Sequence, residues 1–158
     1  MFGKLLSLSL VLMLSSTVSL AAKDLEPQIY YFGAAGCDYC TNGLAYIKRY
    51  KAADARVQYR EFDIITSSDD AEAFVRVVNA IGLSDPRVPM AIIGHHVFVG
   101  YEGDDTTGEE IRLAVEQCRS SGCTDVVKGV LSFGPEIAGA AVKWIVNRRA
   151  AKFATTRQ

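Results

Sequence analysis

The strongest constraint on the fold is a strand-like run that ends in a glycine-rich turn and leads straight into a cysteine pair. Residues 28–32 (QIYYF) are rich in aromatic and β-branched side chains, and the Gly-Ala-Ala-Gly segment at 33–36 ends the run. Residues 39–53 then carry apolar side chains at helical spacing. Cys37 and Cys40 therefore fall at the start of a predicted helix that directly follows a strand.

A second strand and a second helix are predicted next. Residues 56–64 alternate between polar and apolar side chains, which is typical of a strand. Its expected inward positions are Val57, Tyr59 and Phe62. The polar cluster at 67–70 can cap a helix over residues 71–81, and Gly82 closes it.

Two short strands and a third helix complete the pattern. Residues 90–93 and 97–99 are apolar, and the turn at 94–96 between them predicts a hairpin. A loop at 100–108 leads to a helix that starts at residue 107 or 108, with an apolar stripe made of Ile111, Ala114, Val115 and Cys118. This order, β-α-β-α-β-β-α, requires a parallel crossover and an antiparallel pair, and so predicts an α/β sandwich with a mixed sheet.

Length and charge narrow the class of protein. A chain of 158 residues suggests one domain that can bury its own core without disulfides or metals. The formal net charge is −1, so there is no surplus of Lys and Arg for phosphates, and no nucleic-acid partner is expected.

The first residues have the pattern of an export signal. Lys4 precedes an apolar run at 5–14, and the small-x-small pattern Ser19-Leu20-Ala21 fits a cleavage site. We therefore expect a signal peptide at residues 1–21 and a periplasmic or secreted mature chain. The alternative is an uncleaved membrane anchor, although the run of about ten residues is shorter than the roughly 20 that span a bilayer.

The end of the chain is expected to lie outside the main domain. We place that domain at residues 22–123 and a helical extension with a basic tail at 124–158. An amphipathic helix is predicted after Pro135. Packing against the domain with a solvated tail is the simpler interpretation, and docking to a partner or an anionic lipid surface is the alternative.

The C-x-x-C pair has a chemical rationale in this position. At the first turn of a helix, unpaired backbone N–H groups and the helix dipole stabilise a thiolate. Cys37 is therefore the expected nucleophile, and Cys40 lies close enough to resolve a mixed disulfide. Asp38 beside the thiolate disfavours it, which argues against a strongly oxidising site.

Two other interpretations of the pair remain open. One is a local disulfide without turnover. The other is half of a zinc site, which would have to recruit Cys118 with Cys123, or His95 with His96, to reach four ligands. We expect no metal.

Val88 and Pro89 stand just before the strand at 90–93. A cis proline there would suit a tight backbone turn, and residue 88 could then pair its backbone with an extended substrate. An ordinary trans proline that starts a strand is equally compatible with the sequence.

These features together resemble the thioredoxin superfamily, and its glutaredoxin branch most of all, over about residues 28–118. The matching segments are Tyr30-Tyr31-Phe32-Gly33, Cys37-Asp38-Tyr39-Cys40, Arg87-Val88-Pro89-Met90, Ile92-Ile93-Gly94 and Val97-Phe98-Val99-Gly100-Tyr101. The resemblance implies that the fold is a thioredoxin-like three-layer sandwich with a mixed four-stranded sheet. It also implies that the protein is a thiol–disulfide oxidoreductase. It also implies that Pro89 is cis and faces Cys37. The substrate-binding residues it implies are Tyr39, Val88, Pro89, Gly100 and Tyr101.

The resemblance also indicates the partners. This chain has Asp38 in place of the usual proline and a single glycine before Tyr101 where glutaredoxins pair two. Protein thiols and disulfides are therefore favoured as substrates, with glutathione as a candidate co-substrate and no bound cofactor. The exported setting is similar to that of periplasmic members that exchange electrons with a membrane thiol transporter. The alternative function is a binding or assembly module without turnover.

Cys118 and Cys123 lie outside the segments shared with this superfamily. Exported close pairs usually oxidise, so a structural disulfide is expected. A second redox pair is the alternative, but the C-terminus of a helix disfavours a thiolate there.

Overall fold

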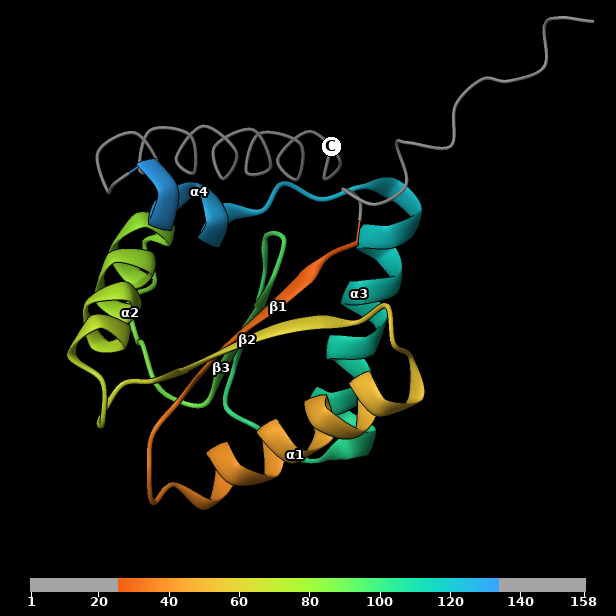
Figure 1. Cartoon of the computed structure of the whole chain (residues 1–158), viewed down its shortest axis with the longest axis horizontal. Coiled ribbons are helices and arrows are strands. Elements are labelled where there is room, and N and C mark those ends of the chain that lie inside the picture. Colours follow the sequence, from red (N-terminus) through yellow and green to blue (C-terminus); the bar gives the residue numbers. More distant parts are fainter. Residues whose placement is uncertain (1–25, 134–158) are drawn as a thin grey trace, which may run out of the picture.

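The structure, a computed structural model, describes residues 26–133 of the chain. The described residues form one four-stranded sheet with helices on both faces (Figure 1). The elements are β1 (Gln28–Gly33), α1 (Asp38–Ala53), β2 (Gln58–Asp63), α2 (Ser68–Ile81), β3 (Met90–Ile93), β4 (His96–Val99), the π-helical turn η2 (Asp104–Gly108), α3 (Glu109–Ser121) and α4 (Val126–Phe133).

The sheet is mixed and its strand order is β2-β1-β3-β4. β1 pairs in parallel with β2 and antiparallel with β3, and β3 pairs antiparallel with β4. Because β1 and β3 are central, every residue of β3 and all of β1 except Gln28 are buried. This topology confirms the thioredoxin-like α/β fold that the sequence predicts.

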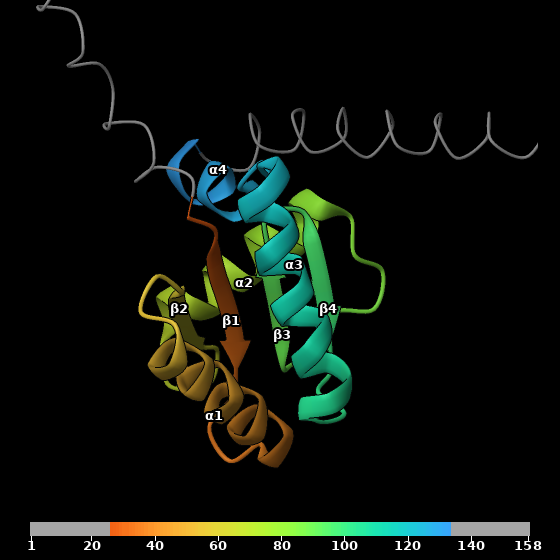
Figure 2. The same ribbon diagram turned by 90° about the vertical axis from the view of Figure 1, so that its right-hand side faces the viewer.

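Helices cover the two faces of the sheet in pairs (Figure 2). On one face, α1 and α3 pack on a core made of Ile29, Tyr31, Ile47, Val57, Ala91, Ile93, Ile111, Ala114, Val115 and Cys118. On the other face, α2 and α4 pack on Tyr30, Phe32, Phe62, Ala73, Val77, Val78, Ala80, Met90, Ile92, Val126, Val127 and Val130. Neighbouring residues of β1 thus alternate between the two cores, as the period of a strand requires.

The second predicted strand needs a correction. Val57 and Tyr59 were expected to face the same core as Phe62, but they pack on the α1–α3 side while Phe62 packs on the α2–α4 side. The reason is that helices cover both faces of this sheet, so side chains that point to either face of the strand can be buried.

Three further differences lie in the second half of the domain. The hairpin turn between β3 and β4 contains only Gly94 and His95, because His96 already pairs with Ile93. The expected loop at 100–108 ends in η2, and α3 starts just after it. α4 was not predicted, and its buried valines extend the globular unit past the expected boundary at residue 123.

Several predictions fall outside the described residues. They are the signal peptide at 1–21, the helix after Pro135 and the basic tail. Within residues 26–133, no helix combines the length and the apolar character that a membrane crossing needs.

α4 is fixed to the sheet by one carboxylate. Asp125 precedes α4, and its Oδ1 accepts a hydrogen bond from the backbone N–H of Lys128 at 2.8 Å. Its Oδ2 accepts another from the hydroxyl of Tyr30, in β1, also at 2.8 Å. Asp125 thus caps the helix and joins it to the central strand.

We expect Asp125→Ala to lower the free energy of unfolding by about 1–3 kcal/mol, because it removes a helix cap and leaves the Tyr30 hydroxyl unpaired. Urea denaturation followed by circular dichroism measures this change. The exposed Asp105→Ala is a matched control and should stay within about 0.5 kcal/mol of wild type. Equal effects of the two substitutions would contradict the role assigned to Asp125.

Candidate active site

Cys37 is the residue that caps the N-terminus of α1. Its backbone is extended (φ −98°, ψ 111°), and its Sγ accepts a hydrogen bond from the backbone N–H of Cys40 at 3.1 Å. The first turn of a helix leaves such N–H groups without helical partners, and the helix dipole is positive there. The helix can therefore stabilise negative charge on the sulfur of Cys37.

The two sulfurs of the pair differ in their exposure. Cys37 and Cys40 are joined in a disulfide; Cys37 is half-buried, while Cys40 is 4% exposed. Between them, Asp38 is exposed and the Tyr39 side chain is 68% exposed. A partner arriving from solvent thus meets Cys37 and Tyr39 first, with Cys40 behind them.

Tyr31 in β1 contacts the first turn of α1. Its ring is buried, and its hydroxyl donates a hydrogen bond to the backbone carbonyl of Cys40 at 2.8 Å. Burial raises the pKa of Tyr31, and the negative charge of Glu61 raises it further, so the hydroxyl remains a protonated donor. Gly33, two residues on, brings β1 close to the helix, since a Cβ there would lie 3.5 Å from the Cβ of Cys40.

Tyr101 contacts α1 at Gly43, beside the Tyr31 hydroxyl. A Cβ at Gly43 would lie 2.5 Å from the Tyr31 hydroxyl and 3.2 Å from the ring of Tyr101. The Tyr101 hydroxyl donates to Asp104, which in turn pairs with Arg49 of α1 at 2.6 Å. Tyr101 is 6% exposed, so it braces α1 and offers little surface to the substrate that it was expected to bind.

Asp63 is a site residue that the sequence analysis missed. It ends β2, and its Oδ1 accepts hydrogen bonds from the backbone N–H groups of Ala35 at 3.3 Å and Ile65 at 3.0 Å. Its Oδ2 accepts from the Thr66 hydroxyl at 2.7 Å. The Thr66 bond, followed by those from backbone N–H groups, lowers the pKa of Asp63. Asp63 thus links the end of β2 to the turn before Cys37. Its one signal in the sequence is that a carboxylate stands near the end of a predicted parallel strand.

The Val88–Pro89 bond is cis, which confirms what the resemblance implied. Phe32 pairs with Met90, so one further step of the register places Pro89 beside Gly33, at the end of β1 that leads to Cys37. The Pro89 carbonyl accepts the backbone N–H of Gly100 at 2.7 Å. The fold thus brings the C-x-x-C turn, Pro89 and Gly100 to one end of the sheet, with Val88 just outside the ladder.

The second disulfide lies at the other end of β1. Cys118 and Cys123 are bonded where α3 ends, and they pack against Gly94. Gly94 follows Ile93, which pairs with Ile29 near the start of β1. The six residues of β1 span about 20 Å, so Cys37 and Cys40 cannot share a metal with this pair or with His95 and His96.

The similarity of this chain to known proteins is seen in comparisons of backbone structure. No known protein family and no curated protein matches this chain. A structural-genomics protein from Agrobacterium tumefaciens is 17% identical, with 62% of this chain and 47% of that chain covered, at a TM-score of 0.48. A glutaredoxin from Archaeoglobus fulgidus is 18% identical, with 61% of this chain and 99% of that chain covered, at a TM-score of 0.42. The chain thus spans about half the length of the Agrobacterium protein.

The fold and the site together define the class of protein. The described residues form a thioredoxin-like domain with a C-x-x-C disulfide in the first turn of α1 and a cis proline at the same end of the sheet. These cysteines suggest a thiol–disulfide redox function.

We expect Gly43→Ala to destabilise the protein by about 1–3 kcal/mol, because the added methyl overlaps the Tyr31 hydroxyl and presses on Tyr101. In a Tyr31→Phe background the same change should cost less, since one of the two clashes is gone. Urea denaturation of the four proteins measures both effects.

Gly129→Ala is the matched control for this experiment. Gly129 lies within α4, and nothing lies within 4 Å of a Cβ placed there. This substitution should stabilise the protein by about 0.5–1 kcal/mol. A neutral Gly43→Ala would show that the contact under α1 is not tight.

Proposed function

We propose that this protein is a thiol–disulfide oxidoreductase that acts on protein substrates, with Cys37 as nucleophile and Cys40 as resolving residue. The observation that carries the proposal is the position of the Cys37 sulfur, which caps α1 and accepts the N–H of Cys40 while bonded to the Cys40 sulfur. A local disulfide with a purely structural role has no need of a helix N-terminus or of a partly exposed sulfur.

The reaction begins with the dithiol form. The Cys37 thiolate attacks one sulfur of a substrate disulfide, which forms a mixed disulfide and releases the other substrate sulfur as a thiolate that takes up a proton. Cys40 loses its proton and attacks the Cys37 sulfur, and the second substrate thiol leaves. The substrate has gained two electrons and two protons, and the protein is left with the Cys37–Cys40 disulfide.

The surroundings of the pair support this assignment. Cys40 is 4% exposed, so an external disulfide reaches Cys37 more easily and Cys40 serves the internal step. Val88 lies just outside the β3 ladder, so its backbone can pair with an extended substrate segment. Tyr39 can add apolar contact because it lies beside the pair and is 68% exposed. We keep glutathione as a candidate co-substrate near Gly100.

We further propose that the protein works in the periplasm or outside the cell and receives electrons from a membrane thiol transporter. The apolar run at 5–14 and the small-x-small pattern at 19–21 support export. In an oxidising compartment, a reductase needs a dedicated supply of electrons, because a Cys37–Cys40 disulfide would otherwise persist.

Substitution of the two cysteines tests the assignment of roles. In an insulin-reduction assay with a dithiol donor, Cys37→Ser should abolish activity. Cys40→Ser should retain attack by Cys37 but accumulate mixed disulfides with the substrate, visible on non-reducing gels. The double variant Cys118→Ser/Cys123→Ser is the control and should keep activity. If wild type and Cys37→Ser were equally inert with every donor, a binding module without turnover would be the better description.

The reduction potential tests the direction of electron flow. We expect a value nearer to the roughly −270 mV of thioredoxin than to the roughly −120 mV of a strong oxidant, because Asp38 adds negative charge beside Cys37. Equilibration of a Cys118→Ser/Cys123→Ser protein with glutathione buffers isolates the Cys37–Cys40 couple. A value above about −150 mV would overturn the reducing role and indicate an oxidase.

A further inference from the structure

Two histidines and a cysteine meet at the end of the sheet opposite to Cys37. One ligand atom from each of His95, His96 and Cys123 lies within 4.8 Å of the other two. The rings of the two histidines lie 4.2 Å apart, centroid to centroid. Cys118 is bonded to Cys123, so its sulfur lies 2.01 Å from that of Cys123 and is the fourth candidate ligand atom beside the group.

Three elements converge to hold this cluster. The hairpin turn between β3 and β4 carries His95, and a Cβ on Gly94 would come within 2.5 Å of the Cβ of Cys123. The end of α3 supplies Cys118. The start of α4 is tied to the same turn, because the N–H of Val126 donates to the carbonyl of Gly94 at 3.3 Å. Cys118 and His96 thus lie on α3 and β4, while His95 and Cys123 lie in short connections whose two ends are held by these elements.

We propose that, when the Cys118–Cys123 disulfide is reduced, Cys118, Cys123, His95 and His96 bind one zinc ion. Two thiolates and two imidazoles form a donor set that zinc takes in tetrahedral structural sites. Bond lengths of about 2.0–2.3 Å place such ligand atoms about 3.5 Å apart, so the atoms of His95, His96 and Cys123 have to approach one another by about 1 Å. After reduction the two sulfurs have to separate from 2.01 Å to about 3.8 Å. In the disulfide form neither sulfur can act as a thiolate ligand.

The chemistry balances with an external dithiol as reductant. The dithiol gives two electrons and two protons to the Cys118–Cys123 bond and becomes a disulfide. Zinc then displaces the two thiol protons as it binds both sulfurs. The metal also offsets a cost of this location, since the C-terminus of α3 disfavours bare thiolates.

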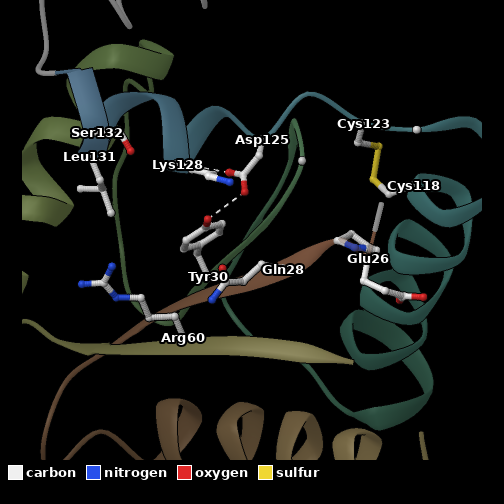
Figure 3. Close-up of a pocket in the computed structure, with 13 residues that line it drawn as sticks. Glu26, Gln28, Tyr30, Arg60, Cys118, Cys123, Asp125, Lys128, Leu131 and Ser132 are labelled. Atoms are coloured by element: carbon white, nitrogen blue, oxygen red, sulfur yellow. Dashed lines mark hydrogen bonds between the residues drawn. A yellow bond between two sulfur atoms is a disulfide. The ribbon is translucent and has the colours of Figure 1, made fainter. Parts of the chain in front are cut away.

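A cavity gives access to the sulfurs (Figure 3). It has a volume of about 460 Å³, and Cys118 and Cys123 lie in its wall with Glu26 close by. Asp125 and Lys128 line the same cavity beside Tyr30 (Figure 3). Cys118 is 1% exposed and Cys123 is half-buried, so a small reductant in this cavity would meet the disulfide at Cys123.

Zinc titration of a Cys37→Ser/Cys40→Ser chain tests the proposal, since the other two thiols are then absent and the outcome is independent of the proposed oxidoreductase activity. After reduction with a phosphine, the protein should take one equivalent of zinc from a chromogenic chelator. The oxidised form of the same protein should bind more than about 100-fold more weakly, since even outer-shell changes at metal sites cost about 10–100-fold. Cobalt in place of zinc should give a thiolate-to-metal charge-transfer band and tetrahedral ligand-field bands.

Substitutions identify the ligands. His95→Gln/His96→Gln should weaken zinc binding by more than about 100-fold, whereas Glu26→Gln, in the wall of the same cavity, should change it by less than about threefold. Equal zinc affinity of the reduced and oxidised forms would overturn the proposal. So would full affinity in the double histidine variant, or a loss caused by Glu26→Gln instead.

Folding of the reduced protein provides a second measurement. Circular dichroism in the presence of a chelator shows whether reduction unfolds the domain. If it does, zinc must restore the native spectrum, and failure to do so would overturn the site. If the reduced domain stays folded, zinc must raise its melting temperature and leave that of the oxidised form unchanged.

Discussion

The packing of the first turn of α1 against β1 is the contact on which the redox site depends. Gly33 and Gly43 have no side chains, so the helix and the strand approach closely enough for the buried hydroxyl of Tyr31 to reach the carbonyl of Cys40. The N–H of the same residue, Cys40, donates to the Cys37 sulfur. The Tyr31 bond thus helps to position the residue that donates to this sulfur.

The site is held from several sides by polar links between elements that are distant in sequence. Asp63 joins the end of β2 to the turn before Cys37, and Asp104 in η2 joins the Tyr101 hydroxyl to Arg49 of α1. These links give the loops around the site a defined geometry. The opposite end of the sheet uses the same device, with Asp125 between β1 and α4.

Much of this could be predicted from the sequence because the local signals agree with the tertiary structure. The strand-to-turn switch before Cys37 and the helical spacing after it gave β1 and α1 almost to the residue, and the hairpin pattern gave β3 and β4. α4 was missed because its eight residues are too short to show a period, and its valines become buried only when the helix packs on α2 and the sheet. Asp63 and the cluster at His95 were missed for a related reason: their partners are neighbours only once strands pair and helices dock, which spacing along the chain does not reveal.

The path of the chain through the domain has a consequence for how the protein can be held in place. β1 enters the sheet at the end where α3 gives way to α4, while Cys37 follows the other end of β1 (Figure 1). Residues 26 and 125 both line the cavity at the entry end, so the chain arrives and begins its exit there. A tether attached at the end of the sheet where residues 26 and 125 lie would thus leave Cys37 on the opposite end of the domain. The surface around Cys37 would then face away from the point of attachment and toward bulky partners.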